Sequence, residues 1–216
     1  MYRTRLMFSS VLAVLALGAV TASSASAFSW WIETKGGGEE VLKAGVKEPF
    51  NEAANVSAPF ILKWKKEFEV SCEGAKYKEA FLEGTVGLGA SSIVFEICKV
   101  AKPANCEVVG GKLETAALVG GIKPVGTAVE FVFEPKAGAT STFVKFTLQG
   151  VGCAKKEVVV KGRAKGELTN PKELTKEKLF VFQNKEGGLM IEEHQVEANG
   201  GKVGYTSKSG KGWSAH

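Results

Sequence analysis

The chain has 216 residues, with 28 Lys and Arg against 23 acidic residues and a formal net charge of +5 at pH 7. Basic and acidic side chains alternate along the sequence, which is typical of solvated faces and excludes the one-sided basic field of a nucleic-acid-binding protein. All acidic residues are glutamates, so Ser-His-Asp triads and EF-hand calcium loops are excluded as well.

The first 27 residues have the three-part layout of a secretory signal peptide. Two arginines begin it, an apolar run over 6–20 follows, and small residues stand at the −3 and −1 positions, Ala25 and Ala27. About 15 apolar residues are too few for a membrane span, which needs roughly 20. We therefore expect residues 1–27 to be removed on export. The mature chain would have no membrane span and would be secreted or associated with the cell envelope.

Residues 28–59 are predicted to be an N-terminal leader or edge segment. The consecutive tryptophans Trp30 and Trp31 and the glycines at 36–38 are typical of a mobile leader. Residues 39–47 favour an edge strand. The main domain is then expected to span residues 60–208.

The clearest periodic signal covers residues 62–72. Even positions are apolar at five of six sites and odd positions are all polar, which predicts one strand buried on one side, with Trp64 in the core. In 92–100, the alternation predicts that Ile97 shares a buried face with Ile93 and Phe95. Further strands are expected at 80–88, 112–119, 128–134, 142–149, 157–165, 178–183, 189–196 and 202–208.

These runs, separated by glycine-rich turns, predict an all-β fold. About ten short antiparallel strands at this spacing favour a β-sandwich or a barrel. One short helix is expected near 171–179, because Asn170 can cap it and Pro171 suits a first helical position. Residues 209–216 are predicted to be a flexible tail.

Four cysteines, Cys72, Cys98, Cys106 and Cys153, are expected to form two disulfides in the oxidising setting that export implies. The spacing lacks the CxxC pairs of zinc and redox sites, so no metal is expected. Three pairings are possible. A turn at 103–105 favours a hairpin that joins Cys98 to Cys106. Cys72 would then pair with Cys153 and, by loop length, contribute more to stability, about 4.5 against about 2.6 kcal/mol.

Motifs for catalysis are scarce. There is no GxSxG elbow and no phosphate-binding GxxxxGK[ST] loop. Glu192 and His194 would share a strand face, but a solvated face is favoured over a metal site. Arg163 is the sole arginine after residue 27, so bidentate binding of phosphate or carboxylate would depend on it. Glutamate pairs are too common in this chain to identify a glycosidase.

Three tryptophans are candidates for ligand binding. Trp30, Trp31 and Trp213 lie near the ends of the expected mature chain, where an exposed indole could stack on a sugar ring.

An ordered series of short motifs carries a resemblance. Its members are the export signal, Glu69-Val-Ser-Cys-Glu-Gly74, Phe95-Glu-Ile-Cys98 with Cys106 after it, Gly150-Val-Gly-Cys153 and Val158-Val-Val-Lys-Gly162. Over residues 60–205 the chain resembles a group of uncharacterised secreted four-cysteine β-domain proteins of actinobacteria. The resemblance implies a small secreted disulfide-bonded β domain, with no activity and no functional residues assigned.

The expected function is that of an exported, non-enzymatic β-domain without a cofactor, which binds or has a structural role at the envelope or outside the cell. A cell-wall glycan and another envelope protein are the candidate partners. The alternatives are a glycan-active hydrolase that uses a glutamate pair, and an adhesion or self-assembly protein that acts through an edge strand.

Overall fold

The computed structural model describes residues 29–53, 58–65, 67–84, 87–90, 92–125, 128–153, 156–184 and 188–215. The expected signal peptide lies outside these residues. The described chain is all-β and antiparallel, as expected, and one 3-10 turn, η1 (Val109–Gly111), is its only helical element. In this part of the chain, no helix has the length and apolar character needed to cross a membrane.

The described residues form twenty strands, about twice the expected number, because several runs are divided by turns and kinks. The strands are β1 (Trp30–Glu33), β2 (Glu39–Val41), β3 (Lys47–Ala53), β4 (Phe60–Trp64), β5 (Phe68–Lys78), β6 (Phe81–Glu83), β7 (Gly87–Ala90), β8 (Ser92–Lys102), β9 (Glu107–Val108), β10 (Leu113–Glu114), β11 (Leu118–Val125), β12 (Ala128–Pro135), β13 (Thr142–Gln149), β14 (Glu157–Gly162), β15 (Ala164–Leu168), β16 (Glu177–Asn184), β17 (Leu189–Ile191), β18 (His194–Gln195), β19 (Glu197–Ser207) and β20 (Trp213–Ala215).

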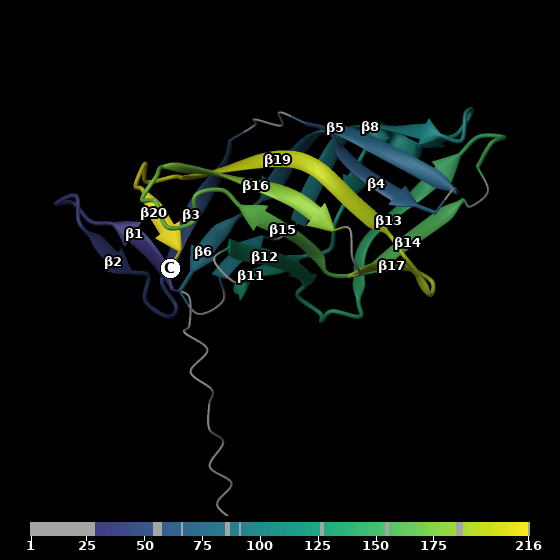
Figure 1. Ribbon diagram of the computed structural model, residues 1–216. Coiled ribbons are helices and arrows are strands. Elements are labelled where there is room, and N and C mark those ends of the chain that lie inside the picture. The colour runs from purple at the N-terminus through teal and green to yellow at the C-terminus, as the bar shows by residue number, and fades with distance from the viewer. Residues whose placement is uncertain are drawn as a thin grey trace, which may run out of the picture.

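A twelve-stranded sheet organises the molecule, in the order β10-β8-β5-β4-β19-β16-β15-β12-β11-β7-β6-β3. An additional pairing between β3 and β19 closes the last eight of these strands into a ring. Strand β19 serves both parts of the sheet, because residues 197–200 pair with β4 and residues 204–207 pair with β3. Figure 1 shows β19 running along most of the molecule.

A three-stranded sheet, β2-β1-β20, lies at one end of the molecule (Figure 1). Its side chains Trp30 and Trp213 reach into the core, where the ring of Trp30 contacts Phe131 of β12 and the ring of Trp213 contacts Phe50 of β3. Both partners belong to strands of the ring. This sheet therefore covers one end of the ring, and we call it the cap sheet.

Beyond the ring, two layers pack in a sandwich-like arrangement. Strands β4, β5, β8 and β10 form one layer, and the sheet β18-β17-β14-β13-β9 forms the other. The ring of Phe68 on β5 meets that of Phe146 on β13 edge-on at 5.9 Å. Phe60 on β4 stacks on Phe95 and also contacts Phe182 of the ring, so both parts share one core.

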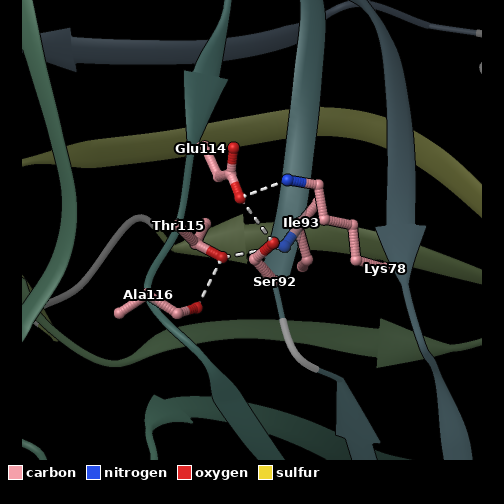
Figure 2. A network of polar contacts seen from close by, with 6 residues as sticks. All are labelled: Lys78, Ser92, Ile93, Glu114, Thr115 and Ala116. Atoms are coloured by element: carbon pink, nitrogen blue, oxygen red, sulfur yellow. Dashed lines mark hydrogen bonds and ion pairs between the residues drawn. The ribbon is translucent and has the colours of Figure 1, made fainter.

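The two layers join at Thr115, which follows β10 (Figure 2). The Ile93 backbone N–H donates to the Thr115 hydroxyl oxygen at 2.9 Å, and the Thr115 N–H donates to the Ile93 carbonyl at 3.0 Å. On its other side Thr115 bridges to Val144, and the Ala116 N–H donates to the Phe143 carbonyl on β13. A buried threonine thus satisfies the backbone where the chain passes between layers.

The expected single strand over 62–72 is wrong. It is a hairpin, β4 and β5, in which Leu62 pairs with Val70 and Trp64 with Phe68. Partners in this register have the same parity, so even residues stay buried on both strands. The alternation in sequence is the same for one long strand and for this hairpin.

The prediction that Ile97 shares the buried face of Ile93 and Phe95 is also wrong. Ile97 is 56% exposed and has φ +54°, a left-handed conformation that is costly for a β-branched residue. The change of conformation shifts the buried face by one residue. Cys98 therefore points into the core.

The expected disulfide pairing is wrong as well, although both disulfides exist. Cys72 lies directly opposite Cys98 in the β5–β8 pairing and bonds to it. Strand β8 continues for four residues beyond Cys98 instead of turning back. Cys106 then leads into β9, which pairs with β13, and bonds to Cys153 just after β13.

The helix expected at 171–179 does not form. Residues 171–174 make a turn, Thr175 bridges to Trp213, and β16 starts at residue 177. The carbonyls of Asn170 and Glu173, which a helix would pair with N–H groups four residues on, accept hydrogen bonds from the Lys178 ammonium instead. A buried side chain here replaces the helical backbone bonds.

Both ends of the described part of the chain belong to the fold. β1 and β3 come from the expected leader, and the expected flexible tail contains β20, whose three residues are all buried. The Ala215 N–H donates to the Pro171 carbonyl at 2.7 Å, and β20 pairs with β1. His216 lies outside the described residues.

Candidate binding surface

The tryptophans predicted to bind a ligand do not form an exposed platform. Trp30 and Trp213 are each 2% exposed, with ring centroids 5.7 Å apart, and they fill the end of the ring under the cap sheet. Trp31 is half-buried and points to the other face of β1. The expected exposure of Trp30 and Trp213 is wrong because β1 and β20 pair with each other and turn both side chains into the core.

Lys178 is a buried lysine beside the paired rings of Trp30 and Trp213. Lys178 is 1% exposed, and its ammonium donates to the carbonyls of Asn170 at 2.7 Å and Glu173 at 2.5 Å. It also lies 5.3 Å from the centre of the Trp213 ring, as in a cation–π contact. Burial lowers the pKa of Lys178 from 10.5 to about 8, against the opposing effect of the Glu173 and Glu39 carboxylates. These contacts hold the loop that contains Asn170 and Glu173 against the ring.

The Lys178 pKa predicts a pH-dependent stability. Between about pH 8 and 10.5 the unfolded chain binds more protons at this lysine than the folded chain does, so raising the pH stabilises the fold. The free energy of unfolding of the parent, minus that of Lys178→Met, is expected to rise by about 3 kcal/mol between pH 7.5 and 10.5. Urea titrations followed by circular dichroism measure both proteins, and the methionine variant cancels the other groups that titrate. Parallel pH profiles would contradict the prediction.

The carboxylate–histidine cluster is a solvated surface. Glu192 and His194 are both exposed, at the turn between β17 and β18. Among the described residues, no three His, Cys or Glu side chains gather in a way that could hold a metal ion. Arg163 lies on the outer face of the ring, where its Nε is 2.7 Å from Glu134 Oε2.

Three loops meet at the end of the molecule opposite the cap sheet (Figure 1). The β5–β8 pairing sets Glu69 against Lys102, so the β4–β5 turn lies beside the end of β8. The β9–β13 pairing sets Glu107 against Gln149, so residues 103–106 lie beside residues 150–153. We call this region the loop end.

The Cys106–Cys153 disulfide fastens two of these loops. Glycines let their backbones touch: a Cβ on Gly150 would lie 2.0 Å from the Asn105 carbonyl oxygen, and one on Gly152 would lie 2.1 Å from that of Ala104. The Gly152 N–H points to the Asn105 carbonyl at 3.4 Å. A disulfide and close backbone contact together make the loop end rigid.

A hollow of about 390 Å³ opens beside these loops. Lys63, Glu69 and Lys102 lie in one row across β4, β5 and β8, and Lys65 stands at the turn with its ammonium 5.5 Å from the Trp64 ring centre. The complete lining is Lys63, Lys65, Phe68, Glu69 and Lys102. Three lysines and one glutamate give this lining a formal charge of +2.

The lysines of the hollow differ from those elsewhere on the same layer. Lys76 pairs with Glu96 at 2.8 Å and Lys78 with Glu114 at 2.6 Å. Within the described residues, no ion pair joins Lys63, Lys65 or Lys102 to a carboxylate. A negatively charged group that enters the hollow would therefore meet ammonium groups that are not already paired with a carboxylate.

Sequence reasoning missed these three lysines as a group. Each stands in a stretch of alternating charge, and 37 positions separate Lys65 from Lys102. Two consecutive lysines in the sequence, Lys65 and Lys66, were the one local signal. Only the pairing of β5 with β8 brings Lys102 to Lys65.

Comparisons with profiles of known protein families, with curated protein sequences and with solved structures find no match to this chain.

Proposed function

We propose that this chain is an exported β-domain that binds an acidic glycan of the cell envelope at the loop end, without catalysing a reaction. The observation that carries the proposal is the hollow lined by Lys63, Lys65 and Lys102, three ammonium groups with no carboxylate partner among the described residues. Carboxylate or phosphate groups on a polysaccharide match this arrangement in charge, and a rigid surface binds with a smaller loss of entropy.

Location outside the cytoplasm supports a partner in the envelope. Two disulfides and no free cysteine among the described residues indicate an oxidising, extracytoplasmic environment. The expected signal peptide and the resemblance to secreted actinobacterial β-domain proteins agree with it. In such a compartment, charged wall polymers are abundant ligands for a basic surface.

Two of the glutamates, Glu96 and Glu114, are poor candidates for the proton donor of a glycosidase. A glycosidase needs one carboxyl group whose pKa is raised, so that it can donate a proton near neutral pH. Hydrogen bonds from Lys76 and Lys112 lower the pKa of Glu96. Those from Lys78 and Ser92 lower the pKa of Glu114, as Figure 2 shows for its contacts. Ionised carboxylates of this kind suit structural ion pairs.

The test is a binding measurement on the oxidised protein by isothermal titration calorimetry. Polygalacturonate supplies carboxylates, polyphosphate supplies phosphates, and dextran is the neutral comparison. The triple variant K63Q/K65Q/K102Q is expected to weaken polygalacturonate binding about 10- to 100-fold at low salt, since each exposed charge contact is worth roughly 0.5–1 kcal/mol. Added salt is expected to weaken the parent in the same way.

The matched control removes three lysines around the cap sheet, K35Q/K43Q/K208Q. It changes the net charge by the same amount at the opposite end and is expected to leave affinity within about twofold. Equal losses in both triple variants would show a general charge effect and sink the proposal. Binding of dextran as tight as that of polygalacturonate would sink it too, whereas preference for polyphosphate would assign phosphate-bearing polymers.

A further inference from the structure

A second hollow, of about 350 Å³, lies on the outer face of the ring, over β11, β12 and Arg163, which directly precedes β15. It belongs to different strands from the loop-end hollow and shares no lining residue with it. Its lining is Val119, Gly120, Gly121, Ile122, Lys123, Val132, Glu134 and Arg163.

The hollow exists because one outward position carries no side chain. Gly121 pairs with Val132 across the β11–β12 ladder and is exposed. A Cβ built on it would have no atom within 4 Å, and its φ is not in the left-handed region. The backbone at this point does not need glycine. The missing side chain at Gly121 therefore opens the hollow on the surface and is not required by the fold.

The floor and the wall of the hollow differ in chemistry. Val119 and Val132 are half-buried and provide aliphatic surface at the bottom. Arg163 and Glu134 form the wall, joined at 2.7 Å, with their side chains 52% and 34% exposed. The ion pair holds both groups in place, and their exposure leaves further hydrogen-bonding capacity toward a ligand.

We propose that this hollow binds one pyranose unit of a neutral sugar. A sugar hydroxyl can accept from the guanidinium while it donates to the carboxylate, so an arginine–glutamate pair satisfies neighbouring hydroxyls without leaving a charge unpaired. The C–H face of the ring matches the two valines. A free carboxylate fits less well, because it would compete with Glu134 for Arg163. This site is independent of the acidic-glycan surface.

Nuclear magnetic resonance of the parent protein tests the site with glucose, galactose, mannose and N-acetylglucosamine, each added singly at millimolar concentration. At least one sugar is expected to shift the Val119 and Val132 methyl signals and the Arg163 Nε–H signal in a saturable way. Glucuronate tests the charge preference. No shift with any of the four neutral sugars, or tighter binding of glucuronate than of glucose, would overturn the proposal.

Gly121→Val fills the hollow and is expected to weaken the sugar response at least about tenfold. The variant is also expected to keep a thermal midpoint at or above that of the parent, since valine suits an exposed strand better than glycine. Gly36→Val is the matched control, because Gly36 lies in the turn between β1 and β2 of the cap sheet, with no atom within 4 Å of a built Cβ and an ordinary φ. It is expected to leave the response unchanged, and persistence of the response in Gly121→Val would overturn the assignment.

Discussion

Replacing Trp213 by alanine is expected to lower the free energy of unfolding by about 4 kcal/mol, the cost of truncating a fully buried large aromatic residue. Trp213 is 2% exposed and lies between the rings of Trp30 and Phe50, at 5.7 and 5.2 Å. Its loss also removes the aromatic face above the Lys178 ammonium. The cavity would form where the cap sheet meets the ring, so β1 and β20 would lose contacts that hold them to the core.

Urea unfolding followed by far-ultraviolet circular dichroism measures this loss without relying on tryptophan fluorescence. Trp31→Ala is the control, since Trp31 is half-buried on the other face of β1. We expect it to cost less than half as much as Trp213→Ala. Equal losses of unfolding free energy in the two variants, or a loss below about 1 kcal/mol in Trp213→Ala, would show that the cap sheet does not depend on the Trp213 side chain.

The double variant C106A/C153A is expected to lose about 4 kcal/mol of unfolding free energy, and C72A/C98A about 3.5 kcal/mol. The estimates follow from the entropy of closing loops with sequence separations of 47 and 26 residues. Removing Cys106–Cys153 also loosens the loop end, so this variant alone is expected to weaken polygalacturonate binding. Denaturant titrations and calorimetry on both variants measure the two effects. Equal binding by both would contradict a role for this disulfide in positioning the loops.

Tryptic digestion without reductant provides the control for the pairing itself. Cleavage after Lys99 separates Cys98 from Cys106, and the Lys102–Pro103 bond resists trypsin. The observed bonds predict that peptide 67–76 stays linked to 79–99, and that 100–112 stays linked to 146–155. A linked pair of 79–99 and 100–112 would instead support the hairpin bridge that spacing favoured.

Alternation along the chain predicted which side chains are buried better than it predicted the path of the chain. Leu62, Trp64, Phe68, Val70 and Cys72 are all buried, as the pattern requires. The chain nevertheless reverses between Trp64 and Phe68, and a hairpin that pairs even residues with even residues keeps the same face inward. The alternation of residue types therefore shows which side chains are buried, but it does not show where the chain turns back.

The candidate surfaces were less accessible to sequence reasoning. The lysines of the loop end and the glycine hollow depend on pairings between β5 and β8 and between β11 and β12. Arg163 stood out by its rarity, but its partner Glu134 did not. Ligand surfaces on a sheet form from neighbours across strands, and a single sequence does not state which strands are neighbours.

By itself, the sequence determined the all-β class, the antiparallel sheets and the presence of two disulfides, because each follows from local spacing or from residue type. Only the tertiary structure decided which cysteines bond, why the 171–179 segment is not helical, and that β1 and β20 form a cap over the core. Those outcomes depend on contacts between distant residues: Cys72 with Cys98 across β5 and β8, Lys178 with the carbonyls of a preceding loop, and Trp30 with Trp213. Such contacts leave no periodic trace in the chain, since their free energy arises from burial and hydrogen bonding that exist only after folding.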